Sequence, residues 1–224
     1  MKRFFDVAFS IVVLVALSPV LLLAALAVKL TSPGPVFYGA ERAGLNGEPI
    51  RVLKFRSMVR GADKAATVTI GSDARITTVG KWLRASKLDE IPQLWNILLG
   101  EMSVIGPRPE SLDIVENHYT DEERETLRVR PGLTCPGNLI YYVFHEDLRP
   151  PQGVSANDFY VEHLLRPKLL ADLYYVRNPS FVFDLQLIID TTRIIVAKWF
   201  GIDFKWTPKF SAKPPAGWKG DAFR

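Results

Sequence analysis

Two adjacent carboxylates, Asp89 and Glu90, stand among cations in segment 83–96 and are the residues best suited to chemistry. Side chains at consecutive positions point in different directions, so divided roles are expected rather than a shared proton. An ionised Asp beside a cation-shielded phosphate can attack phosphorus, and a neighbouring Glu can hold a divalent ion such as Mg²⁺. The pair therefore indicates phosphate chemistry.

The element that positions this pair is expected to be a helix that begins near Asp89 and runs through Leu99. Pro92 is tolerated in the first turn of such a helix. Asp89 then lies at or beside the N-cap, where it stays ionised, and Arg84 and Lys87 upstream complete an anion site at the helix end. The alternative is that the two acids serve only as helix caps and dipole partners.

Two further cations are held in proline-rich turns. Segment 103–110 contains Pro107-Arg108-Pro109, which predicts a rigid turn that directs the Arg108 side chain. Arg130 precedes Pro131-Gly132 in the same arrangement. Both arginines are therefore candidates for phosphate binding.

The N-terminal region is a membrane candidate, because residues 7–28 carry no charge and would form a helix of roughly 33 Å. Ser18-Pro19 lies at its middle, where proline bends the axis and the serine hydroxyl can satisfy the freed backbone. A kinked spanning helix, a helix-break-helix hairpin and a cleaved signal segment are the alternatives. Cations flank both ends, which favours two cytoplasmic ends and hence the hairpin.

The rest of the chain predicts an α+β fold, mainly helical with one small β-hairpin. Strands at 36–38 and 50–55 are joined by a turn at Asn46-Gly47, a polar loop covers 61–80, and helices cover 81–88 and 112–128. Residues 181–200 form an amphipathic helix that packs on the core or lies in the membrane interface. The expected regions are 1–30 (re-entrant membrane helix), 31–206 (cytoplasmic catalytic domain with interfacial helices) and 207–224 (flexible tail).

Composition narrows the partners. The 224 residues, 48% of them hydrophobic, suffice for one core plus membrane elements, and the net charge of +4 suits anionic head groups or nucleotide phosphates. No nucleic-acid motif is present, so nucleic acid is not an expected partner. A single cysteine excludes an intrachain disulfide, and three scattered histidines form no zinc pattern.

Four motifs in order carry a resemblance. They are Lys-Phe-Arg-Ser-Met at 54–58, the acidic pair within 84–96, Gly-Glu-Met-Ser-Val-Ile-Gly-Pro-Arg-Pro at 100–109 and Arg-Pro-Gly-Leu-Thr at 130–134. With these motifs the chain resembles the monotopic phosphoglycosyl transferases, the bacterial sugar transferase family. The resemblance implies transfer of sugar-1-phosphate from a UDP-sugar to a polyprenyl phosphate with release of UMP, the first membrane step of surface glycan or exopolysaccharide synthesis.

The resemblance also implies roles for individual residues. Asp89 matches the nucleophile that forms a covalent phosphosugar intermediate, and Glu90 matches the carboxylate associated with Mg²⁺. The matching substrate-binding cations are Arg84 and Arg108, which contact phosphate, together with Lys54, Arg56 and Arg130. Ser18-Pro19 matches the break of a re-entrant helix, which places the catalytic domain on the cytoplasmic face of the bacterial inner membrane among its lipids.

The chain departs from the family at Cys135-Pro136, and loop 145–157 also differs, which bears on nucleotide or sugar selectivity. No N-terminal multi-span region is present in this sequence, so a minimal catalytic unit is expected. The sequence is compatible with a homo-oligomer. Two other functions stay open: a non-catalytic membrane-anchored scaffold derived from this family, and a basic peripheral nucleic-acid binder.

Overall fold

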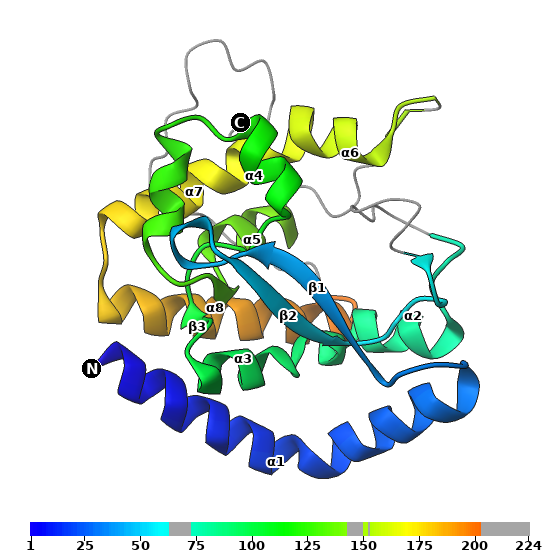
Figure 1. Ribbon diagram of the computed structural model, residues 1–224. Coiled ribbons are helices and arrows are strands. Elements are labelled where there is room, and N and C mark those ends of the chain that lie inside the picture. Colours follow the sequence, from blue (N-terminus) through cyan, green and yellow to red (C-terminus); the bar gives the residue numbers. More distant parts are fainter. Residues whose placement is uncertain (63–72, 143–149, 152, 203–224) are drawn as a thin grey trace.

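The computed structural model describes residues 1–62, 73–142, 150–151 and 153–202 (Figure 1). Within them the chain is mainly helical, as the sequence predicted, and it has two small sheets where one hairpin was expected. A helix, α1, and a β-hairpin whose turn is η1 (Leu45–Gly47) come first in the chain. The elements that follow are α2 (Thr78–Ala85), η3 (Leu88–Glu90), α3 (Gln93–Leu99), β3 (Ser103–Ile105), α4 (Leu112–His118), η4 (Glu123–Arg128), β4 (Gly132–Thr134), α5 (Pro136–Ile140), α6 (Ala156–Phe159), the π-helical η6 (Tyr160–Leu165), α7 (Arg166–Arg177) and α8 (Phe181–Trp199).

Helix α1 (Lys2–Thr31) continues through Ser18 and Pro19 and bends near its middle, so the expected break is a bend (Figure 1). Proline has no N–H for the carbonyl four residues earlier, that of Val15. The Ser18 hydroxyl donates to this oxygen at 2.8 Å, which keeps the turn satisfied. The helix is long and apolar enough to cross a bilayer, and it is the only such helix among the described residues.

Both ends of α1 contact the rest of the protein. Near the N-terminus, the Lys2 ammonium lies 2.8 Å from Asp184 of α8, and Asp6 accepts from the backbone N–H of Val104 at 2.9 Å. Near the C-terminal end of this helix, Ala24 and Val28 belong to one buried cluster with Phe55 and Leu83. The helix therefore lies along the protein and returns to it (Figure 1).

The predicted hairpin is present as the antiparallel pair β1 (Phe37–Ala43) and β2 (Pro49–Phe55), in which Tyr38 pairs with Lys54. Asn46 and Gly47 both have positive φ, as the turn prediction requires. The strands are longer than expected because the ladder extends from Phe37–Phe55 to Ala43–Pro49.

A second pairing was not predicted: β3 and β4 form a short parallel pair, so 103–105 is a strand rather than part of a turn. Two glycines allow it, since a Cβ on Gly106 would lie 2.3 Å from the Arg130 carbonyl oxygen and one on Gly132 would lie 2.1 Å from the Gly106 nitrogen. The backbones that follow Ile105 and Arg130 therefore meet with no room for side chains.

Several helix boundaries also differ from the sequence predictions. α2 begins at Thr78 rather than Lys81, because the Thr77 hydroxyl accepts from the Gly80 N–H at 2.9 Å and caps it earlier. The helix expected at 112–128 is divided into α4 and η4. The break follows His118, where the backbone of Tyr119 is extended and its ring is buried in a cluster with Ile114 and Leu164. The tail 207–224 lies outside the described residues.

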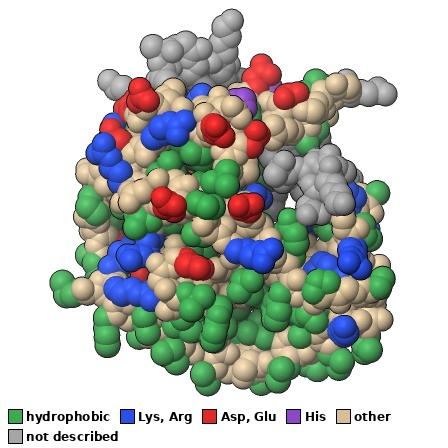
Figure 2. Space-filling model, viewed as in Figure 1, with side chains coloured by type: hydrophobic (Ala, Val, Ile, Leu, Met, Phe, Trp, Pro, Cys, Tyr) green, Lys and Arg blue, Asp and Glu red, His purple; other side chains and the backbone are tan. Residues whose placement is uncertain are grey.

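Helix α8 packs on the core, which is one of the two predictions for residues 181–200, and it also exposes an apolar face. Leu187, Ile194 and Ala197 are buried, whereas Leu185, Ile189 and Trp199 are exposed. Exposed large apolar side chains also occur on α1, α2 and α3, and Figure 2 shows hydrophobic side chains gathered along the lower side of the molecule. An exposed apolar surface of this kind is typical of a membrane or protein contact.

Candidate active site

Asp89 and Glu90 lie in the short 3₁₀ turn η3, and the helix expected to begin there starts only at Gln93. Two residues cause the difference. Lys87 has a left-handed φ of 58°, which turns the chain sharply after α2, and Pro92 occupies the N-cap of α3 without a side-chain cap. Asp89 is therefore not the N-cap of α3, contrary to the prediction.

Asn96 fixes this turn relative to the hairpin. Its side-chain oxygen accepts from the Leu53 N–H at 2.9 Å, and its amide nitrogen donates to the Arg51 carbonyl at 2.8 Å. One buried amide on α3 thus satisfies two backbone groups of β2. Because Lys54 follows on the same strand, Asn96 sets the spacing between Lys54 and the acidic pair.

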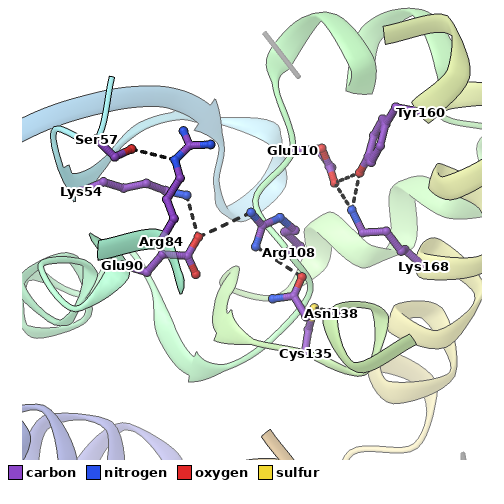
Figure 3. Close-up of polar contacts among 10 residues, drawn as sticks. All are labelled: Lys54, Ser57, Arg84, Glu90, Arg108, Glu110, Cys135, Asn138, Tyr160 and Lys168. Carbon is purple, nitrogen blue, oxygen red and sulfur yellow. Dashed lines mark hydrogen bonds and ion pairs between the residues drawn. The ribbon is translucent and has the colours of Figure 1, made fainter. Parts of the chain in front are cut away.

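Glu90 lies between two cations (Figure 3). Its Oε1 is 2.7 Å from the Lys54 ammonium and 3.6 Å from the Arg108 guanidinium. Burial raises the pKa of Glu90, but the charges of Lys54, Arg108 and Lys87 outweigh it and hold the pKa well below its ordinary value. Glu90 is a fixed anion in this site.

Asp89 has the opposite environment. It is 7% exposed, and among the described residues none donates a hydrogen bond to its carboxylate or pairs with it within 4 Å. Burial, followed by the charge of Glu90, raises its pKa to about 6, against the lowering effect of Lys54, Arg84 and Lys87. At neutral pH Asp89 is thus a largely ionised carboxylate with little solvation, which favours nucleophilic attack.

Arg108 is held through its backbone as well as its side chain. Asp172 of α7 accepts from the Arg108 N–H at 3.2 Å and from the Gly137 N–H at 2.9 Å. The guanidinium is 3.3 Å from the Asn138 side-chain oxygen, and the flanking prolines restrict the loop as predicted. Burial lowers the pKa of Arg108, but Glu90 outweighs it and raises the pKa above its ordinary range.

The predicted cations separate into two groups. Lys54, Arg84 and Arg108 gather around the acidic pair, where the Arg84 Nε donates to the Ser57 hydroxyl at 2.8 Å (Figure 3). Arg56 and Arg130 do not join them. Arg56 donates to the Ser32 carbonyl at 2.8 Å beyond α1, and Arg130 donates to the Gly100 carbonyl at 2.6 Å, at the far end of α3.

A magnesium ion fits this donor set only with substrate oxygens. Among the described residues, no three His, Cys, Asp or Glu side chains gather to hold a metal without help. Magnesium in phosphate enzymes commonly takes one or two carboxylates, substrate phosphate and water. Glu90, ionised and fixed, is suited to that role, with Asp89 adjacent.

Sequence reasoning missed a cluster of buried polar groups next to Arg108 in the chain. Glu110, two residues further on, accepts from the Lys168 ammonium at 3.1 Å and from the Tyr160 hydroxyl (Figure 3). Lys168 is only 5% exposed, and η6 is the π-helical stretch that supplies Tyr160. No spacing in the sequence joins these residues, because they meet only through the packing of α7 beside the Arg108 loop.

Comparison with known proteins assigns the class. The model of the bacterial sugar transferase family matches residues 1–198, and the chain belongs to this family. The chain is 46% identical over 194 residues to the UDP-glucose:undecaprenyl-phosphate glucose-1-phosphate transferase of Escherichia coli K12, covering 85% of this chain and 39% of that protein. It therefore spans well under half of that relative.

Two other relatives extend the comparison. The exopolysaccharide production protein PSS of Rhizobium leguminosarum bv. phaseoli is 37% identical over 198 residues, which cover 85% of this chain and 92% of that protein. The UDP-N-acetylgalactosamine-undecaprenyl-phosphate N-acetylgalactosaminephosphotransferase of Aeromonas hydrophila is 32% identical over 198 residues, 87% of this chain and 43% of that protein. Family members are thus named for different sugars.

Proposed function

We propose that this protein transfers sugar-1-phosphate from a UDP-sugar to a polyprenyl phosphate, releasing UMP, as a membrane step of exopolysaccharide synthesis. The observation that carries the proposal is the contrast within the acidic pair: Glu90 is bound by Lys54 and Arg108, whereas the buried Asp89 carboxylate has no such partner among the described residues. Relatives named as undecaprenyl-phosphate sugar transferases support the substrate classes.

In the proposed mechanism an Asp89 oxygen attacks the sugar-bearing phosphorus of the donor. The bond between this phosphorus and the oxygen bridging to UMP breaks, UMP leaves, and a phosphosugar stays on Asp89. Lys54, Arg84 and Arg108 offset the negative charge of the diphosphate and orient it. Magnesium held by Glu90 supplies further charge neutralisation when bound. The acceptor phosphate then displaces Asp89 as a carboxylate.

The re-entrant topology belongs to this proposal. Both ends of α1 contact the same domain, at Asp184 and Val104 for one end and at Phe55 and Leu83 for the other. A helix that crossed a hydrocarbon layer of about 30 Å would carry one end away from that domain. A hairpin that enters and leaves on the cytoplasmic side of the inner membrane keeps the site where soluble donor and lipid acceptor meet.

The experiment that tests the proposal is a panel of UDP-sugars, supplied with undecaprenyl phosphate and magnesium to the full chain in detergent and scored for UMP. We expect one or a few donors to turn over. Failure of every donor would favour the scaffold function, and the responding donor would name the sugar.

Asp89→Asn tests the nucleophile, because an amide cannot form the covalent phosphosugar. We expect a loss of UMP release of at least about 10³-fold, with unchanged membrane association, while Asp113→Asn on the exposed side of α4 retains activity. Mass spectrometry of the wild-type chain mixed with donor alone should detect the adduct on Asp89. Full activity in Asp89→Asn would remove the assignment.

A further inference from the structure

A second basic site lies next to the acidic pair, in a hollow between α2 and the C-terminal part of α8. The end of α8 is bound to α2 here, since the Trp199 Nε1 donates to the Ala85 carbonyl at 3.3 Å. The hollow is lined by Arg84, Ala85, Lys87, Tyr142, Ile194, Ile195 and Lys198. Cations and aliphatic side chains therefore share one small space.

The cations of this hollow converge on one aromatic ring. The Lys87 ammonium lies 4.2 Å from the centroid of the Tyr142 ring, and the Lys198 ammonium lies 5.3 Å from it. Lys87 reaches this position from a left-handed backbone conformation, which is unfavourable for a residue with a side chain and is common at functional sites. Burial, followed by the charge of Lys87, lowers the pKa of Lys198 to about 8. Such a grouping is complementary to an anion.

The surroundings indicate an amphiphilic anion. Ile194 and Ile195 line the hollow itself, and Trp82, Val196 and Trp199 on the same two helices are exposed. A soluble diphosphate needs no such apolar rim, whereas a phosphate joined to a hydrocarbon chain does. Two other cations, Lys54 on the hairpin and Arg108 on its proline-flanked loop, contact Glu90 and do not line the hollow.

The hollow is also close enough to act on the acidic pair. The charges of Arg84 and Lys87 lower the pKa of Asp89. The charges of Glu90 and Arg108 in turn act on the pKa of Tyr142, which Glu90 raises and Arg108 lowers. A phosphate held here has Asp89 beside it. Arg84 then serves the donor phosphates in the first step and the acceptor phosphate in the second, whereas Lys54 and Arg108 stay with Glu90.

We propose that Lys198, together with Arg84 and Lys87, binds the phosphate of the polyprenyl acceptor and directs it toward the phosphosugar on Asp89. This rests on the proposed function. An oxygen of the deprotonated acceptor phosphate attacks the phosphorus bound to Asp89, a new P–O bond forms the lipid diphosphate sugar, and the bond between phosphorus and the Asp89 oxygen breaks. The three cations offset the repulsion between the two phosphates, and no proton transfer is required.

The test separates the two half-reactions in the full chain. We expect Lys198→Gln to release one equivalent of UMP from donor alone at the wild-type rate, while KM for undecaprenyl phosphate rises about tenfold through loss of a charge-assisted hydrogen bond. Lys198→Arg should recover most of the affinity. Arg193→Gln, on the same helix with a 64% exposed side chain, is the matched control and should leave both constants unchanged.

A binding measurement without donor makes failure of this proposal distinguishable from failure of the proposed function. The wild-type chain should bind undecaprenyl phosphate more tightly than undecaprenol, and Lys198→Gln should lose that preference. The acceptor site would be overturned if Lys198→Gln left the KM for undecaprenyl phosphate unchanged or raised only the KM for the UDP-sugar. It would also be overturned if the wild-type chain bound vesicles of phosphatidylglycerol as tightly as undecaprenyl phosphate. If the wild-type chain turned over no donor but still bound undecaprenyl phosphate more tightly than undecaprenol, only the proposed function would be contradicted.

Discussion

Asp89 and Glu90 are adjacent in the chain, yet their surroundings move their pKa values in opposite directions. Burial dominates at Asp89 and raises its pKa to about 6, whereas at Glu90 Lys54 and Arg108 outweigh burial. Carboxylates whose pKa values are separated in this way commonly divide an acid–base or nucleophilic task. The separation arises because η3 places one side chain against the cations and leaves the other without a bond among the described residues.

This environment predicts that Asp89 destabilises the fold. A carboxylate whose pKa rises from 3.8 unfolded to about 6 folded opposes folding by up to about 3 kcal/mol above pH 6. The native state binds the extra proton, so relative to neutral pH this group stabilises the fold fully below about pH 4, and that stabilisation is lost as the pH rises through about 6. Asp89→Asn should therefore raise the thermal unfolding midpoint in detergent at about pH 8, and the gain should vanish near about pH 4.

Asp113→Asn is the control for that measurement, because Asp113 is exposed and its replacement should leave the midpoint unchanged at both pH values. A gain in Asp89→Asn that is equal at both pH values would show that burial of charge is not its cause.

At the scale of elements, the first turns of α1 are attached to the catalytic domain by buried polar contacts. Asp6 is 3% exposed and accepts hydrogen bonds from the Ser103 hydroxyl and the Val104 N–H of β3. Arg3 donates to the Leu98 carbonyl at 2.8 Å, at the C-terminal end of α3. Helix α1 and the candidate site are therefore one packed unit.

Asp6→Ala is expected to destabilise that unit by about 2–4 kcal/mol, because it leaves two buried donors without an acceptor. Asp6→Asn, which keeps an acceptor oxygen, should lose less. The thermal unfolding midpoint in detergent measures both, with the exposed Lys29→Gln on the same helix as the control. An Asp6→Ala midpoint equal to that of Lys29→Gln would show that the contact contributes nothing.

The sequence was sufficient for elements that are determined locally. The uncharged run around Ser18-Pro19, the Asn46-Gly47 hairpin and the proline-flanked Arg108 each depend on backbone preferences of nearby residues. A predicted helix boundary was wrong where a single residue determined it. The positive φ of Lys87, for example, turns the chain before the helix that was expected to begin near Asp89. The β3–β4 pair and the contacts of Lys198 could not be predicted, since they join segments far apart in the chain.

The candidate site shows the same division. The acidic pair and the nearby Arg84 were found because they share one motif, and Arg108 was found from its proline-flanked turn. Lys54 was found only through the family resemblance. The contacts of Arg56 and Arg130 with backbone carbonyls are a tertiary property, and their predicted substrate roles stay predictions. Charge type in a motif thus indicates an anion site but does not say which cations the fold turns toward it.

For the whole molecule, the exposed apolar side chains and the bent α1 are consistent with the proposed contact with a bilayer. Trp82, Trp95 and Trp199, each more than half exposed, lie on three different helices, and tryptophan is enriched at membrane interfaces. A protein that rests on the bilayer by this surface and inserts only α1 keeps both ends of α1 and the catalytic domain on one side.

Cysteine labelling in intact cells tests that arrangement, and the chain is well suited to it because its one native thiol, Cys135, is fully buried. A cysteine inserted directly after Met1 and, in a second variant, Glu116→Cys on exposed α4 should both resist an impermeant thiol reagent and both react after the membrane is permeabilised. The re-entrant helix requires this joint protection, since the two sites then share the cytoplasm. Reaction of only one of them in intact cells would establish a spanning helix, and the contacts of Lys2 and Asp6 with the catalytic domain could not then coexist with that topology.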